Sequence, residues 1–398
     1  MQSGVLRGFV RGVVMLSILV GACNPEANQH DRQKKKKVET LADLGALPLS
    51  VTDPHDNPTT PEKVHLGRLL FFDPILSGNR DVACATCHQP EFGYAEFLQT
   101  SIGVNGVGSG SRRKFKEPND IPFTKRNSQS VLNTAFNGIT NEGRYSPEKA
   151  PMFWDLRAKG LEEQALFPIM TLEEMRGHDF AENEIVDEVV SRLRKVEEYR
   201  ELFHSAFPGE KEPVSKLNLS KALASFQRTL INPNTRFDQY MRGDSGALST
   251  SEKEGLNLFL SSGCAKCHNG PMLSDFKLHA LGAPEADHLT EPDRSIQNDF
   301  AFRTPTLRNL RFTAPYMHSG KFTTLKQVME FYEDIAGNKL RNPHIKPEQI
   351  DPLVKEMTVN FKDISRIVEF LNVLSNDDFD KTVPERVPSG LPPGGYLN

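Results

Sequence analysis

Apolar residues recur at helical spacing along most of this chain, three or four positions apart, with polar residues between them. The pattern predicts helices over residues 61–72, 161–167, 182–195, 197–207, 217–230, 237–241, 251–260 and 324–334, and a last helix with one apolar stripe formed by Ile364, Ile367, Val368 and Leu371. Ser251 with Glu254, and Thr324 with Gln327, fit capping boxes at two helix starts. Because no segment shows a clear strand alternation, we expect a mainly α fold.

Two of these helices carry the same pattern and precede the same short motif. Gly67 and Phe71 in the first helix correspond to Gly255 and Phe259 in the later one. Each helix is followed by a Cys-x-x-Cys-His sequence. This repetition predicts a divergent internal repeat, in which two related halves are joined by long loops.

The Cys-x-x-Cys-His sequence occurs as Cys84-Ala85-Thr86-Cys87-His88 and as Cys264-Ala265-Lys266-Cys267-His268. Its thiols lie one helical turn apart, where they can add to the vinyl groups of a haem, and the histidine can bind the iron as an axial ligand. A zinc knuckle would need four ligands at one site, and a thioredoxin-like redox pair has no use for the histidine. We therefore expect two covalently bound c-type haems in two cytochrome c-like domains in tandem, with His88 and His268 as iron ligands.

Charge and cysteine usage bear on the compartment. The 398 residues carry a net charge of −4, which gives no basis for nucleic-acid binding, and of five cysteines only Cys23 lies outside the motifs. Residues 1–23 resemble a bacterial lipoprotein signal with Val20-Gly21-Ala22-Cys23 as its lipobox, although an ordinary cleaved signal peptide ends in similar small residues. Covalent haem attachment requires an export-side compartment. We expect a periplasmic or cell-envelope protein anchored to the membrane by a lipid on Cys23.

Composition divides the rest of the chain into four further parts. Residues 24–40 are polar and lysine-rich, which predicts a flexible tether. We expect an N-terminal haem domain over residues 41–240 and a C-terminal one over residues 241–380. Residues 381–398 form a Pro/Gly tail.

The chain resembles the bacterial di-haem cytochrome c peroxidase and MauG family over about residues 50–375. Beside the two motifs, the resemblance is carried by Leu-Phe-Phe-Asp-Pro at 70–74, Ser-Gln-Ser-Val-Leu-Asn at 128–133, Phe-Trp-Asp-Leu-Arg-Ala at 153–158 and Thr-Ala-Pro-Tyr-Met-His-Ser-Gly at 313–320. It implies that hydrogen peroxide is split at the first haem and that the second haem transfers electrons. Trp154, the single tryptophan, matches the residue between the haems in that family, although a packed core position is the commoner role of tryptophan.

The resemblance also implies roles for residues beside the haems. Glu174 matches the family's acid–base group, and Gln164 and Pro168 match its neighbours in the peroxide pocket. A carboxyl group in an apolar pocket can take a proton from peroxide and return it to the leaving oxygen. Glu173 is the alternative, and only the spacing from Trp154 favours Glu174. The family also holds one Ca²⁺ ion, and its oxygen donors match Asn127, Thr313 and Pro315.

The first haem departs from the classical members of the family. Those members carry a histidine after Ser-Ile-Gly that ligates the first iron in the resting enzyme, whereas here Val104 follows that tripeptide. No histidine occurs between His88 and His178. We therefore expect the first iron to be five-coordinate or water-bound when oxidised.

The second haem departs from them as well. Its distal ligand is a methionine in classical members, and the matching position here is Tyr332, as in MauG. Met329 lies one helical turn earlier on nearly the same face and competes with the tyrosine, and Met317 is a weaker competitor.

We expect an exported di-haem peroxidase that receives electrons from a small donor protein, either a cytochrome c or a cupredoxin. The first alternative is an enzyme that uses peroxide to oxidise residues of a partner protein. The second is a di-haem electron carrier, but a carrier has no use for Glu174 and Gln164 beside an open iron.

Overall fold

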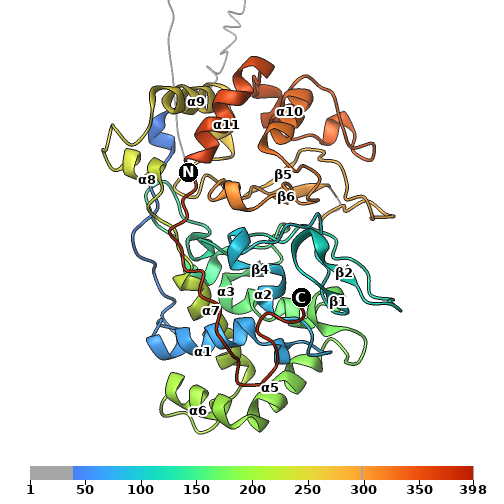
Figure 1. Cartoon of the computed structure of the whole chain (residues 1–398). Helices are drawn as coiled ribbons and strands as arrows, with labels where there is room; N and C mark the ends of the chain where they lie inside the picture. Colours follow the sequence, from blue (N-terminus) through green and yellow to red (C-terminus); the bar gives the residue numbers. More distant parts are fainter. Residues whose placement is uncertain (1–38, 297–298, 398) are drawn as a thin grey trace, which may run out of the picture. The chain divides into compact units, whose positions relative to one another are not determined.

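The computed structural model describes residues 39–296 and 299–397, and this part of the chain is mainly helical, as predicted (Figure 1). The predicted signal, most of the tether and Cys23 lie outside the described residues. The helices are α1 Pro61–Phe72, α2 Cys84–Cys87, α3 Gly160–Gln164, α4 Phe167–Met170, α5 Ile185–Lys195, α6 Glu197–Ala206, α7 Lys216–Thr229, α8 Arg236–Met241, α9 Thr250–Ser261, α10 Leu325–Ala336 and α11 Ile364–Asn372. No helix of the described residues is long and apolar enough to span a bilayer.

The described residues also contain short antiparallel strand pairs, which the sequence pattern did not predict. Their bounds are β1 Gly106–Val107 with β2 Lys114–Phe115, β3 Pro151–Met152 with β4 Ala158–Lys159, and β5 Leu278–Ala280 with β6 Ala301–Arg303. In the last pair His279 lies opposite Phe302. Strands of two or three residues are too short to show an alternation, so their absence from the prediction follows from their length.

Several helix boundaries differ from the predicted ones by one to three residues. The segment predicted as one helix over 161–167 is divided into α3 and α4, which are separated at Ala165 and Leu166. The start of α9 is earlier than expected, because the extended Ser249 accepts a hydrogen bond from the backbone N–H of Glu252 and forms the capping box with it. Ser251 lies inside the helix, so the box predicted for Ser251 and Glu254 is wrong. The box of Thr324 and Gln327 at the start of α10 is confirmed.

In the first half of the chain, α1 packs against α7 at Gly67. A Cβ atom built on Gly67 would lie 2.0 Å from the carbonyl oxygen of Ala222, so only glycine permits this approach. One turn further along α1, the ring of Phe71 meets the ring of Phe226 edge-on, at 5.2 Å between centroids. This contact belongs to a large apolar core that includes residues of α1, α5, α6 and α7.

In the second half, α9 packs against α11 in the same manner. A Cβ atom on Gly255 would lie 2.1 Å from the carbonyl oxygen of Arg366. The rings of Phe259 and Phe370 lie 5.2 Å apart. The repeated Gly-x-x-x-Phe pattern thus marks a helix crossing in each half, and the second crossing belongs to a separate apolar core.

After α11 the chain turns back to the first half, where the dark red segment passes α7 and α5 and ends near α2 and β1 (Figure 1). We call residues 379–397 the strap. Val387 is almost fully buried in the core of α1 and α7, and Gly394 donates its N–H to the carbonyl of Phe72 at 2.7 Å. The predicted Pro/Gly tail is therefore packed against the first half at Val387 and at Gly394, while several residues between them are exposed.

Candidate active site

Both Cys-x-x-Cys-His sequences form a single tight turn. The first is the short helix α2, and the second begins with the 3₁₀ turn Cys264–Lys266. In each turn the histidine N–H donates to the carbonyl of the first cysteine at 3.0 Å, so that both thiols and the imidazole lie close together. The four cysteines of the motifs are free of disulfides.

The two motif histidines are held in the same way. His88 donates from Nδ1 to the carbonyl oxygen of Tyr94, and His268 to that of Leu273, each at 3.0 Å. A hydrogen bond at Nδ1 fixes the tautomer and leaves Nε2 free to bind a metal. Burial lowers the pKa of both imidazoles, which favours the neutral form that ligates iron.

A cavity of about 640 Å³ is lined by both motifs together. Its wall includes Cys84, Cys87 and His88 from the first motif and Cys264, Cys267 and His268 from the second. Trp154, Gln164, Glu174 and Tyr332 also line it, although they come from distant parts of the sequence. Residues that were predicted from separate motifs therefore line the same cavity.

Polar groups in this cavity fit the acidic side chains of a haem. Arg303 is 5% exposed, and among the described residues its guanidinium donates only to neutral oxygens, those of Phe153 and Gln129. Burial lowers its pKa to about 10. His318 is 6% exposed, and its Nε2 atom has no hydrogen-bond partner. A buried cation without a carboxylate and an unpaired buried donor both suit the propionates of a haem.

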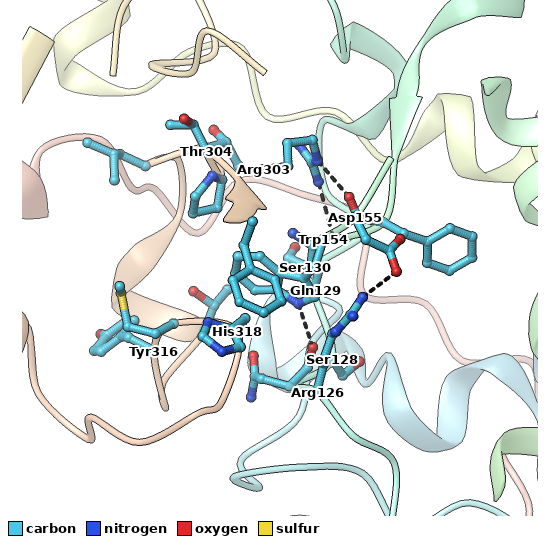
Figure 2. A pocket seen from close by; sticks show the side chains of 18 of the residues that line it. Arg126, Ser128, Gln129, Ser130, Trp154, Asp155, Arg303, Thr304, Tyr316 and His318 are labelled. Atoms are coloured by element: carbon cyan, nitrogen blue, oxygen red, sulfur yellow. Dashed lines mark hydrogen bonds and ion pairs between the residues drawn. The ribbon is translucent and has the colours of Figure 1, made fainter. Parts of the chain in front are cut away.

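Trp154 is held in the cavity wall by its indole N–H, which donates to the carbonyl of Asn127 at 3.0 Å (Figure 2). Its ring meets the ring of His318 edge-on, with centroids 6.4 Å apart. The His318 ring in turn stacks on Phe302 at 3.6 Å. Three rings thus follow one another along the wall.

An ion-pair network lies beside these rings. Arg126 pairs with Asp155 at 2.5 Å (Figure 2). It also donates to Asp293 at 2.9 Å, and its guanidinium lies 5.2 Å from the centre of the Phe302 ring. Arg157 adds a second cation to Asp155 at 3.0 Å. Because Asp155 follows Trp154 directly, this network fixes the backbone that carries the tryptophan.

Glu174 lies on the π-helical turn Leu172–Arg176, and its position is fixed by the loop behind it. The N–H of Val104 donates to the carbonyl of Glu174 at 3.1 Å, and a Cβ atom on Gly103 would lie 2.2 Å from that oxygen. The side chain of Val104 is fully buried in the first core. The segment that carries Val104 is therefore a packed support for the turn with Glu174.

The Glu174 carboxyl group has the character of an acid–base group. Burial raises its pKa to about 7, although Arg157 opposes the shift. Gln164 at the end of α3 and Pro168 on α4 line the same cavity. Glu173 lines it too, so the structure brings the predicted residue and its alternative together.

Near the second motif, α10 presents both candidates for the distal ligand. Tyr332 and Met329 line the cavity, and so does Met317 from the preceding loop. Burial raises the pKa of Tyr332, and the thiols of Cys267 and Cys264 lie close enough to add to that effect. The three predicted competitors therefore all line the cavity, and Tyr332 lies close to the cysteines of the second motif.

The residues predicted to bind calcium, Asn127, Thr313 and Pro315, also line the cavity. The side-chain amide nitrogen of Asn127 donates to the carbonyl of Leu98 at 3.0 Å, which leaves its amide oxygen available as a hard donor. The backbone N–H of Asn127 donates to the carbonyl of His318 at 2.7 Å. The donor set suits Ca²⁺ chemically, and its occupancy stays a prediction.

The sequence pattern did not single out His279, which is buried in β5 between two carboxylates. Its Nδ1 atom lies 2.7 Å from Asp351, and its Nε2 atom lies 3.0 Å from Asp275. Although burial lowers its pKa, the hydrogen bonds to Asp275, Cys267 and Asp351 prevail and raise it to about 11. Asp351 is distant in sequence, so no spacing rule could have found this cluster.

The comparisons with known proteins agree with this site. A model of the di-haem cytochrome c peroxidase family matches residues 61–246. The chain is 35% identical to the methylamine utilization protein MauG of Methylorubrum extorquens, over 86% of this chain and 88% of that protein. The chain belongs to the di-haem cytochrome c peroxidase family. It is also 33% identical to cytochrome c551 peroxidase of Pseudomonas aeruginosa, over 77% of this chain and 81% of that protein.

Solved structures of related proteins have the same fold as this family member. A MauG-like protein associated with microbial copper homeostasis is 27% identical, with a TM-score of 0.66 over 84% of this chain and 95% of that one. The diheme peroxidase BthA of Burkholderia thailandensis, at 20% identity, has a TM-score of 0.60 over 87% of this chain and 98% of that one. The resemblance drawn from the motifs is confirmed, and membership of a di-haem family implies one c-type haem at each motif.

Proposed function

We propose that this protein is a di-haem c-type peroxidase that reduces hydrogen peroxide at the first haem, which His88 would ligate, with electrons supplied through the second haem. The observation that carries the proposal is the shared cavity, whose wall holds both motifs together with Glu174 and Trp154. When bound, the haems would supply the iron at which the O–O bond breaks and the redox centres that exchange electrons. The described side chains account for the proton chemistry and the positioning.

Glu174 moves the protons. Reduction of one peroxide consumes two electrons and two protons and yields two waters. With a pKa of about 7, the carboxylate can accept the first proton of peroxide and return it to the departing oxygen at neutral pH. Gln164 faces the same cavity and can hold peroxide by its amide without carrying charge. A plain electron carrier has no need of either group.

Trp154 offers an aromatic step between the two haem sites. Its N–H is fixed by Asn127, and its neighbour Asp155 is fixed by Arg126. Fixed ring orientation favours electron transfer because little reorganisation is needed at the moment of reaction. We assign the transfer of oxidising equivalents to this ring.

A second candidate, oxidation of residues in a partner protein, is supported by Tyr332 in the cavity wall. An anionic phenolate on the second iron would lower its potential and stabilise its oxidised forms, whereas a thioether would raise the potential. A centre that holds oxidising equivalents can then take electrons from a protein substrate. A small cytochrome c or cupredoxin is the donor in the peroxidase alternative.

The remaining assignments follow from the same proposal. The first haem domain spans residues 41–240 and the second spans residues 241–380, in tandem, which the paired crossings at Gly67 and Gly255 support. Covalent haem attachment supports a periplasmic or cell-envelope location, and lipid on Cys23 would anchor the chain. One Ca²⁺ ion would bind near Asn127.

The experiment that tests the proposal measures peroxide consumption by the purified holoprotein, either fully oxidised or reduced beforehand by one electron. We expect the oxidised protein to react directly, because Val104 is packed in the core and offers no ligand to the first iron. Electron paramagnetic resonance should show one high-spin haem. Two low-spin haems, together with inertness to peroxide until an electron is added, would contradict this proposal.

A further inference from the structure

The strap makes contact with the first haem site at two separate points. At its start, the carbonyl of Asp380 accepts the phenolic hydrogen of Tyr94 at 2.7 Å. Tyr94 is fully buried, and its own carbonyl accepts the Nδ1 hydrogen of His88 at 3.0 Å. The strap therefore touches the residue that orients the predicted axial ligand.

At its other end, the strap contacts the attachment turn itself. Thr86, which lies between the two cysteines of the first motif, donates its hydroxyl to the carbonyl of Gly394 at 2.7 Å. The same hydroxyl accepts the N–H of Ala83 at 2.8 Å. Gly395 forms an isolated antiparallel bridge with Val82. One buried hydroxyl thus joins the start of the turn to the strap.

Backbone conformation makes this contact specific. Gly394 and Gly395 both have positive φ, at 79° and 83°. A Cβ atom on Gly395 would lie 2.5 Å from the carbonyl of Asp81 and 3.2 Å from the hydroxyl oxygen of Thr86. Only glycine combines this backbone conformation with so close an approach. The Gly-Gly pair is therefore required by the fit against the motif.

Beyond the glycines, the strap joins the loop that supports Glu174. The carbonyl of Tyr396 accepts the N–H of Gly108 at 3.0 Å, and its ring lies 4.3 Å from the amino group of Lys116. The buried Arg113 donates to the carbonyls of Ile102 at 2.6 Å and Gly103 at 2.9 Å. This loop therefore carries contact from the strap to the turn with Glu174.

We propose that the strap is a positioning device for the first haem, which sets the geometry of His88 through Tyr94 and that of the attachment turn through Thr86. This inference rests on the proposed function only in taking His88 as the ligand of a haem. Partners of a ligating histidine usually tune the metal, and their loss costs roughly tenfold to a hundredfold in affinity or activity. The strap would thus act on the first haem through Tyr94 and Thr86, the residues that hold its predicted ligand and its attachment turn.

The test uses full-length holoprotein with single substitutions. Thr86→Val removes the hydroxyl at constant shape, Thr86→Ser keeps it, and Tyr94→Phe removes only the bond to Asp380. Arg386→Ala is the matched control, because it breaks an ion pair between the strap and Glu198 on α6, away from the motif. Intact mass first establishes that each variant carries two haems.

The readout is the iron–histidine stretching band of the reduced first haem in resonance Raman spectra. We expect Thr86→Val and Tyr94→Phe to shift this band and to slow peroxide reduction, by less than the roughly tenfold to hundredfold that loss of a direct partner of the histidine costs. Thr86→Ser and Arg386→Ala should match the parent. The second haem's bands should not move in any variant.

Parental spectra of the first haem in both Thr86→Val and Tyr94→Phe would overturn the inference. So would shifts confined to the second haem. Loss of the first haem from Thr86→Val alone leaves Tyr94→Phe as the deciding variant, because its side chain lies outside the attachment turn. The Raman shift does not depend on turnover. Failure of the peroxidase proposal could therefore be told apart from failure of the inference about the strap.

Discussion

At the scale of single residues, chemistry depends on burial more than on residue type. Glu173 and Glu174 are neighbours and both reach the cavity, yet burial brings the pKa of Glu174 to about 7. At Arg303 burial shifts the pKa in the opposite direction and lowers it to about 10. The guanidinium hydrogen bonds that the described residues show go to neutral oxygens and not to a carboxylate. These shifts define what each group can do at neutral pH.

Glu174→Gln should slow the peroxide step by about a hundredfold or more, the usual scale for a lost acid–base group. Burial raises the pKa, so the proton is held until the pH reaches about 7, and the parent rate should increase with pH through that value. The variant should lose this dependence. Stopped-flow measurement at several pH values checks it, with Glu173→Gln as the control.

Haem content must stay unchanged in both variants for the comparison to hold. If Glu173→Gln alone shows the loss, the acid–base role belongs to Glu173. If both variants kept the parental rate, neither Glu173 nor Glu174 would be the acid–base group.

Tyr332→Phe should change the spectrum of the second haem and leave that of the first unaltered. If the Tyr332 phenolate ligates the second iron as proposed, it would be a hard anionic ligand, and its loss would leave that position open or admit another ligand. Absorption and electron paramagnetic resonance spectra of the holoprotein check this. A sulfur-to-iron charge-transfer band that only Met329→Ala abolishes would instead identify methionine as the ligand and favour the classical peroxidase.

At the scale of elements, helix crossings are specified by glycine. Gly67 and Gly255 allow the backbones of α1 and α7, and of α9 and α11, to approach within contact of a carbonyl. Both positions could be recognised in the sequence, because the Gly-x-x-x-Phe pattern repeats. The partners of these crossings, Ala222 and Arg366, could not be recognised. Their contact is made by a backbone oxygen, which every residue type carries.

Gly255→Ala should destabilise the protein by about 1–3 kcal/mol, because the new methyl group would meet the Arg366 carbonyl in a packed core. Alanine otherwise favours a helix, so a stabilising effect would show that the crossing can relax. Denaturant unfolding of the holoprotein measures the change. Asn257→Ala, on the exposed side of α9, is the control and should change stability by less than about 0.5 kcal/mol.

At the scale of the whole described chain, two apolar cores each include a pair of crossed helices, and one cavity is lined by both motifs. The sequence predicted the helical class, the motifs and the residues matched to the family. It could not predict that Arg303 is buried or that His279 meets Asp351, because arginine is normally exposed and the latter two residues are 72 positions apart. Tertiary contacts of this kind have no local signal.

Intact mass of the mature protein should exceed that of the apoprotein by two haems, because each motif offers two free thiols and a histidine with its Nε2 atom available. Cys84→Ala with Cys87→Ala should remove one haem, and the matched pair at Cys264 and Cys267 should remove the other. Expression with a haem-attachment system is required. A parent mass with one haem or none would contradict the prediction.

The strap also bears on the order in which the parts of the first haem site are synthesised. The hydroxyl of Thr86 meets Gly394 across 308 positions of sequence, so the ribosome completes the first motif long before it makes the segment that closes behind it. Until residues 394–396 have been synthesised, the attachment turn lacks its contacts with the strap, and the thiols of the first motif are accessible on an unfinished domain. Haem could thus be joined to Cys84 and Cys87 before the strap packs against the attachment turn.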